Sequence, residues 1–179
     1  HPLTFDMFEN EEYSVYMKMC LNDLKSDSNV RKMIHELGHV LYFSSYKNQT
    51  NLFKLISPNS AIHEAIGETF LLIHNGCKEH SKESQINSLI REALTSFVRI
   101  PFALSLEEWR ESLFESTSIS NINMDYWTIR NRYQKIYPLE YSGMQPLSKF
   151  HVINFMPYLR YGSAVFVTHQ LYETFCEPY

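Results

Sequence analysis

The chain lacks a basic cluster, a long apolar run and an internal repeat. It has 179 residues, of which 16 are Lys or Arg and 20 are Asp or Glu, for a formal net charge of −4. The missing basic block argues against nucleic acid as a partner. No apolar run reaches the roughly 20 residues of a membrane-spanning helix, so we expect no transmembrane segment within the chain. A hydrophobic content of 44% predicts a globular protein.

Cysteine is also scarce, and its number is odd. The three cysteines are Cys20, Cys77 and Cys176. No signal peptide is visible, but the chain opens on His1, so we expect it to be cut from a longer protein whose other parts hold disulfide partners. Asn48 begins an Asn-Gln-Thr sequon, which is usable only in a secreted protein. We therefore expect a secreted or extracellular protein, compatible with a membrane anchor outside this segment.

The pattern of apolar residues predicts a mostly α protein with one small β-hairpin. Two aromatic-rich stretches near the N-terminus, Thr4–Phe8 and Tyr13–Met17, predict the hairpin. Apolar spacing of three and four predicts the helices, and Pro101 is expected to kink or break the third. The expected helices are 27–46, 61–74, 84–113 with that interruption, 123–136 and 157–175.

The motif that organises the chain is His35-Glu36-Leu37-Gly38-His39. Positions four apart share one face of a helix, so His35 and His39 point the same way and can bind one zinc ion. Glu36 lies beside them, where it can take a proton from a water that the metal activates. Apolar flanks indicate that the two imidazoles face an interior, where they need a partner.

A peptidase zinc needs a third protein ligand and one open position. A third histidine six residues after His39 is excluded, because Ser45 stands there. Glu64 and Glu68 share a face of the next predicted helix, so Glu64 fits as the ligand and Glu68 as the acid that holds a ligating imidazole from behind. His63 competes for the third position, but it is rotated about 100° from Glu64 around the helix.

These residues together resemble the angiotensin-converting enzyme family of zinc peptidases. The resemblance covers almost the whole chain and rests on several blocks of sequence. They are His1 with Phe5-Asp6, His35–His39, Tyr46-Lys47, His63–Glu68, Tyr126-Trp127 with Arg130, Lys149–His151, Pro157–Tyr161 and Tyr172–Cys176. It implies a helical zinc-peptidase domain with a glutamate ligand, of which residues 1–179 are one part, truncated at both ends and inactive alone.

The resemblance also implies a role for each matching residue. His35, His39 and Glu64 would bind zinc, and Glu36 would be general base and then general acid. His151 and Tyr161 would stabilise the oxyanion. The substrate would be held by Lys149 and Tyr158 at its C-terminal carboxylate and by His1 along its backbone. Arg160 and Arg130 would help to hold chloride ions.

The implied activity is zinc-dependent release of C-terminal dipeptides from oligopeptides with a free C-terminus. Lys149 and Tyr158 favour this activity over the family's single-residue carboxypeptidases, which lack both. A zinc peptidase of another glutamate-ligand family and a secreted, catalytically silent binding homologue remain as alternatives. Gly162, where the family usually has an aromatic residue, implies an altered substrate pocket.

The family's disulfides would pair Cys20 and Cys176 with cysteines outside the segment. Cys77 has no counterpart in the family, so the resemblance implies no partner for it.

Overall fold

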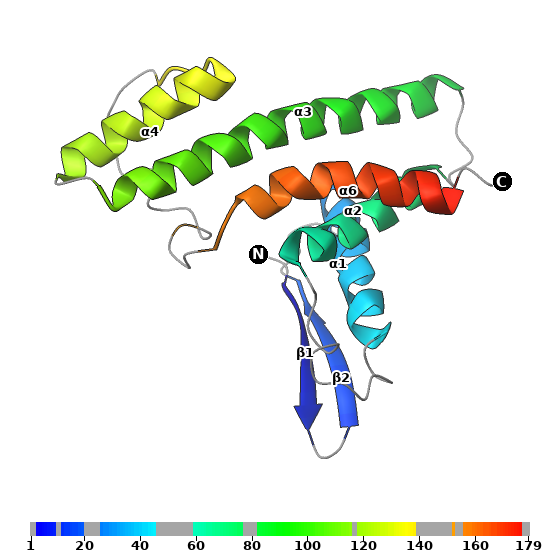
Figure 1. Cartoon of the computed structure of the whole chain (residues 1–179). Coiled ribbons are helices and arrows are strands. Elements are labelled where there is room, and N and C mark those ends of the chain that lie inside the picture. The colour runs from blue at the N-terminus through cyan, green and yellow to red at the C-terminus, as the bar shows by residue number, and fades with distance from the viewer. Residues whose placement is uncertain are drawn as a thin grey trace. The chain divides into compact units, whose positions relative to one another are not determined.

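A computed structural model describes residues 3–9, 12–19, 26–45, 59–76, 82–115, 118–138, 152 and 156–176. Within these residues the protein is mostly α, with one two-stranded antiparallel hairpin at the N-terminal end, which confirms the predicted fold class (Figure 1). The elements are β1 Leu3–Glu9, β2 Glu12–Lys18, α1 Asp27–Ser45, α2 Ser60–Gly76, α3 Lys82–Leu113, α4 Ile119–Gln134 and α6 Leu159–Cys176. None of the described helices is both long enough and apolar enough to cross a bilayer.

The hairpin forms where aromatic side chains alternate along two short stretches. Its register pairs Leu3 with Lys18, and it runs without a break to the pair of Glu9 and Glu12. Phe5 lies opposite Tyr16, and their rings stack with centroids 5.6 Å apart. Such cross-strand aromatic pairs stabilise a hairpin and fix its register. The predicted hairpin is thus confirmed.

Polar residues set the first turns of α1 and α2. The carbonyl of Ser26 accepts from the N–H groups of Asn29 and Val30, so α1 begins directly after it. The side chain of Asn59 accepts from the N–H of Ala61 at 2.7 Å, which satisfies a donor that the start of α2 would otherwise leave without a partner. The helix extends to Gly76, two residues beyond the predicted end.

The sequence predicted a kink or a break at Pro101, and the break is wrong, because α3 continues through the proline from Lys82 to Leu113. Proline removes one backbone hydrogen bond from a helix interior. The turns that follow are held by tertiary packing, since Ala103, Leu106 and Trp109 are fully buried. Burial of these side chains outweighs the local preference of proline.

The start of α4 also differs from the prediction. The helix begins at Ile119, four residues earlier than expected, after Ser118 in an extended conformation. It ends at Gln134, because Lys135 adopts a left-handed conformation with φ of 56° and donates its N–H to the carbonyl of Asn131. This left-handed residue gives α4 a C-terminal cap without glycine.

The chain divides into two compact units. The first comprises residues 1–88 and 166–179, and the second comprises residues 89–165. In the first unit, the carbonyl of Ala65 on α2 accepts hydrogen bonds from the hydroxyls of Thr69 and Thr168, which joins α2 to the C-terminal part of α6. In the second unit, Trp109 packs edge-on against Tyr126 and donates its indole N–H to the carbonyl of Ile122 at 2.9 Å.

Candidate metal centre

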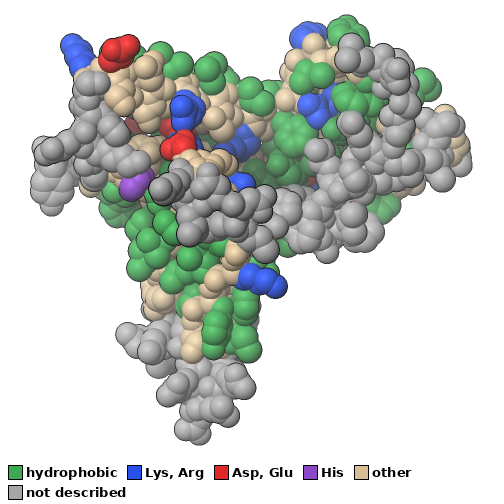
Figure 2. Space-filling model, turned by 180° about the vertical axis from the view of Figure 1, so that it is seen from behind, with side chains coloured by type: hydrophobic (Ala, Val, Ile, Leu, Met, Phe, Trp, Pro, Cys, Tyr) green, Lys and Arg blue, Asp and Glu red, His purple; other side chains and the backbone are tan. Residues whose placement is uncertain are grey.

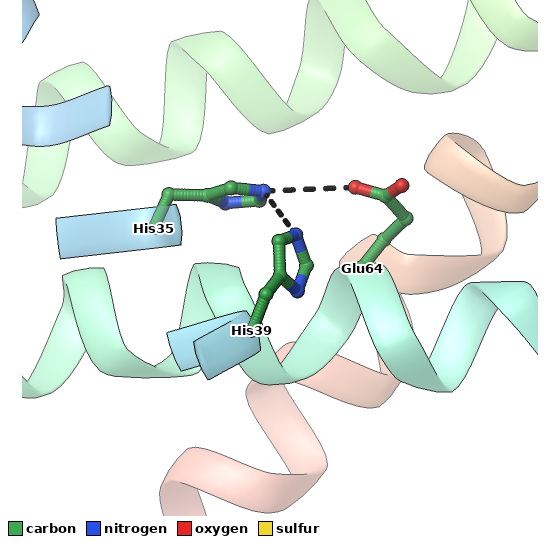
Figure 3. Close-up of side chains that lie close together, drawn as sticks. All are labelled: His35, His39 and Glu64. Carbon is green, nitrogen blue, oxygen red and sulfur yellow. Dashed lines mark hydrogen bonds and ion pairs between the residues drawn. The ribbon is translucent and has the colours of Figure 1, made fainter. Parts of the chain in front are cut away.

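The candidate site lies in the first unit, where α1 and α2 pack together. His35 and His39 are four residues apart on α1 and project from the same face, as the spacing predicts (Figure 3). Their Nε2 atoms are only 3.0 Å apart, and His39 is buried. Two ring nitrogens that converge at this distance suit a shared cation between them.

Glu64 on α2 completes a group of three donors. Its Oε2 atom is 3.6 Å from Nε2 of His35, and the donor atoms of the three residues all lie within 4.8 Å of one another (Figure 3). In a tetrahedral zinc site, bonds of about 2.0–2.2 Å place neighbouring ligand atoms roughly 3.3–3.6 Å apart. The residues therefore fit a zinc ion with three protein ligands.

A second carboxylate contacts the other ring nitrogen of His35. Oε1 of Glu68 lies 3.5 Å from Nδ1 of His35, while Nε2 of the same ring faces Glu64. A carboxylate at Nδ1 favours the tautomer that carries its proton there, which leaves the lone pair of Nε2 for a metal. The structure thus places Glu68 beside His35, and its role in orienting a zinc ligand stays a prediction.

His63, the rival for the third ligand position, has a different neighbour in the structure. Its ring stacks almost parallel on that of His39, with centroids 4.2 Å apart, and it also contacts the rings of Tyr42 and Phe43. The group of converging donors contains Glu64 and not His63. The ring of His63 thus covers one face of the His39 imidazole.

The two imidazoles differ in their readiness to hold a proton. Burial, together with the charges of His35 and His63, lowers the pKa of His39 to about 3, so His39 keeps its lone pair at neutral pH. Burial alone would lower the pKa of His35 as well. The hydrogen bond with Glu64 and the negative charges around the ring outweigh that effect and raise it. A metal ion entering the site therefore competes with a proton at His35.

Two glycines allow α1 and α2 to approach this closely. A Cβ atom built on Gly38 would lie 2.9 Å from the Cα of Gly67, and one built on Gly67 would lie 2.8–3.0 Å from three atoms of the His35 ring. The backbone of Gly67 thus lies directly against the His35 imidazole, between Glu64 and Glu68. The sequence prediction missed this role, although the position of Gly38 and Gly67 inside predicted helices was a signal of close packing.

Replacing Gly67 by alanine is expected to push the His35 ring out of the slot between the two carboxylates. We expect zinc affinity to fall about 10- to 100-fold, the range typical of losing an interaction that orients a ligand. Competition with a chromophoric chelator measures the affinity. Gly76→Ala is the control, because its new Cβ would meet the Tyr172 hydroxyl at 3.0 Å, away from the three donors. Equal zinc affinity in Gly67→Ala and the wild type would contradict the assigned role.

Four residues with predicted roles in oxyanion stabilisation, substrate binding or chloride binding lie in the second unit. Tyr158 and Tyr161 lie with ring centroids 4.8 Å apart, and the hydroxyl of Tyr161 accepts from Arg160 at 3.2 Å. Glu107 on α3 accepts from the backbone N–H of Tyr158 at 2.9 Å, which holds the start of α6 in place. Arg130 donates to the hydroxyl of Tyr126 at 2.6 Å and lies over the ring of Phe102.

Gly162, predicted to mark an altered substrate pocket, is also in the second unit. A Cβ added there would lie 3.0 Å from the Cβ of Ala103 on α3. A larger side chain would therefore press against the buried face of α3. This contact gives a packing reason for the glycine.

Several predicted site residues lie outside the described residues. They are His1, Lys149, His151, the sequon residue Asn48, and Cys20 and Cys77. Cys176 ends α6, but its side chain is not among those described. The roles given to these residues stay predictions.

Comparison with known proteins agrees with the resemblance seen in the sequence. The family described as angiotensin-converting enzyme matches residues 1–178. The chain is 29% identical to angiotensin-converting enzyme of Mus musculus and 27% identical to the angiotensin-converting enzyme-related protein of Drosophila melanogaster, over 98% of its length in each case. It is 31% identical to angiotensin-converting enzyme of Theromyzon tessulatum over 80% of its length. It spans 14%, 30% and 26% of these relatives, respectively. The chain belongs to the angiotensin-converting enzyme family.

Proposed function

We propose that this chain is the zinc-binding part of a peptidase that releases C-terminal dipeptides from oligopeptides. The observation that carries the proposal is the convergence of His35, His39 and Glu64 beside the buried carboxylate of Glu36. This donor set, with a carboxylate next to it in the same helix, suits peptide hydrolysis by a water molecule. Membership of the family supports the same reaction.

In this proposal Glu36 carries the proton. Zinc, when bound by His35, His39 and Glu64, supplies a Lewis acid that polarises the peptide carbonyl and makes water a better nucleophile. Glu36 takes a proton from the attacking water as the water oxygen bonds to the carbonyl carbon. It then gives that proton to the amine nitrogen as the C–N bond breaks.

Other residues would bind the substrate and its developing charge. His151 and Tyr161 donate hydrogen bonds to the oxyanion, and Lys149 and Tyr158 bind the free C-terminal carboxylate. His1 contacts the substrate backbone. The neighbouring positions of Tyr158 and Tyr161 at the start of α6 support a shared substrate-binding role.

Chloride binding by Arg160 and Arg130 is a further part of the proposal. The Nε atom of Arg130 is buried and has no hydrogen-bond partner among the described residues. A buried guanidinium nitrogen without a partner costs free energy, and a small anion would satisfy it. This observation supports a chloride site near Arg130.

We also propose that the segment packs into a larger catalytic domain. Two helices expose rows of apolar side chains at a spacing of four residues, a pattern typical of a buried helix face. The rows are Met33, Leu37 and Leu41 on α1 and Ile90, Leu94 and Val98 on α3. The lower half of Figure 2 shows hydrophobic side chains gathered over the hairpin and the neighbouring helix. The chain covers only 14% of the length of the mouse relative, which supports the same proposal.

The proposed location is extracellular. A secreted protein would use the Asn48 sequon and would pair Cys20 and Cys176 with cysteines elsewhere in the complete protein. The chain itself contributes no membrane-spanning helix among its described residues. Oligopeptides outside the cell are therefore the proposed substrates.

The decisive experiment follows the products of a tripeptide with a blocked N-terminus, using the complete protein with zinc. We expect release of the C-terminal dipeptide, detected by mass spectrometry, and little hydrolysis of the same peptide with an amidated C-terminus. Lys149→Ala is expected to raise KM at least tenfold, because it removes a cation that pairs with the carboxylate. Release of a single amino acid would indicate the carboxypeptidase alternative. No hydrolysis by a zinc-loaded protein would indicate a silent binding homologue.

A further inference from the structure

A hydrogen bond joins the hairpin to the carboxylate of Glu36. Thr4 lies on β1, 32 residues before Glu36, and its hydroxyl contacts both Oε2 of the Glu36 carboxylate and, at 3.4 Å, the Glu36 backbone carbonyl. Glu36 itself is only 7% exposed. The hairpin thus reaches the side chain that the proposed function makes the proton carrier.

The hydroxyl has one proton, so it donates fully to only one of these two oxygens. The backbone carbonyl is the longer contact, and its position inside α1 already pairs it with an N–H four residues later. The carboxylate carries the charge and makes the shorter contact. Hydrogen bonds to charged acceptors are the stronger ones. Thr4 therefore donates its proton to Oε2 of Glu36.

We propose that Thr4 is a positioning residue for Glu36. Its hydroxyl holds Oε2 and so fixes the plane of the carboxylate, which leaves Oε1 as the oxygen that exchanges the proton. That proton passes from the attacking water to Oε1 and from Oε1 to the leaving amine, while Thr4 keeps its own. The inference rests on the proposed function, because it gives Glu36 its task.

A purely structural role for Thr4, anchoring the hairpin to α1, predicts different consequences. An anchor acts through shape and stability, so its loss would lower the unfolding temperature and disturb substrate binding. A positioning role acts on the proton transfer, so its loss lowers kcat and leaves KM and zinc content nearly unchanged. The hydroxyl alone carries that role, so serine can replace threonine.

The test compares Thr4→Val, Thr4→Ser and Ser14→Ala in the complete zinc-loaded protein, with Glu36→Gln as reference. Valine keeps the shape and removes the donor. Ser14 pairs with Met7 in the hairpin, so its side chain lies on the opposite face from Thr4 and serves as the matched control. The measurements are kcat and KM on the blocked tripeptide, zinc content and unfolding temperature.

We expect Thr4→Val to lower kcat about 10- to 100-fold with KM changed less than about twofold, the effect of one hydrogen bond to a charged group. Thr4→Ser and Ser14→Ala are expected to stay near the wild-type kcat. If hydrolysis depends on Glu36 but Thr4→Val keeps its kcat, or Thr4→Ser loses as much as valine, the positioning role is wrong and the proposed function stands. If the wild type and Glu36→Gln hydrolyse equally, the proposed function itself fails.

Discussion

Replacing Glu64 by alanine is expected to abolish tight zinc binding while the helices stay folded. Glu64 supplies one of the three donor atoms that lie within 4.8 Å of one another, and no other carboxylate belongs to that group among the described residues. With two imidazoles left, we expect zinc affinity to fall more than about a hundredfold, beyond the loss typical of an orienting residue. Zinc content after dialysis and competition with a chelator measure the change, and far-UV circular dichroism reports the fold.

Two matched variants make the result specific to the ligand. His63→Ala removes the histidine next to Glu64, whose ring stacks on His39 without joining the donor group, so it is expected to keep about one zinc ion per chain. Glu68→Ala removes the carboxylate behind His35 and is expected to weaken zinc binding about 10- to 100-fold without abolishing it. Zinc lost in His63→Ala and kept in Glu64→Ala would reverse the assignment of the third ligand.

The donor set was predictable because each step in it is local. A spacing of four places His35 and His39 on one helix face, and the same rule places Glu68 beside Glu64. The remaining step, the meeting of α1 and α2 at Glu64, followed from the need of a peptidase zinc for a third protein ligand. The structure brings Glu64 within 3.6 Å of His35, as this reasoning requires.

What the sequence did not reveal depends on contacts between distant residues. Thr4 and Glu36 are 32 residues apart, and nothing near Thr4 marks its hydroxyl as different from that of any other threonine in a strand. Gly38 and Gly67 look like weak points in their helices until the two backbones are seen in contact. Pro101 fails as a helix breaker for the same reason, since buried neighbours outweigh its local preference.

The conversion of Glu36 to glutamine is expected to lower kcat about 10²- to 10⁴-fold, the contribution typical of general acid–base catalysis. Glutamine nearly matches glutamate in shape but does not accept a proton at neutral pH. Zinc content and KM are expected to stay close to the wild type, because Glu36 is not one of the three converging donors. Steady-state kinetics on the blocked tripeptide, with zinc measured on the same samples, test this prediction. Glu111→Gln, at an exposed position of α3, is the control for the chemical change.

A double variant tests whether Thr4 acts on kcat through Glu36. If Thr4 acts only by orienting the carboxylate, removing its hydroxyl has nothing left to impair once Glu36 is glutamine. The double variant Glu36→Gln/Thr4→Val is therefore expected to match Glu36→Gln alone, as residues that act as one unit are non-additive. Losses that multiply would separate Thr4 from the proton transfer. Unchanged kcat in Glu36→Gln would contradict the proposed function, because that function needs Glu36 both to accept and to return the proton.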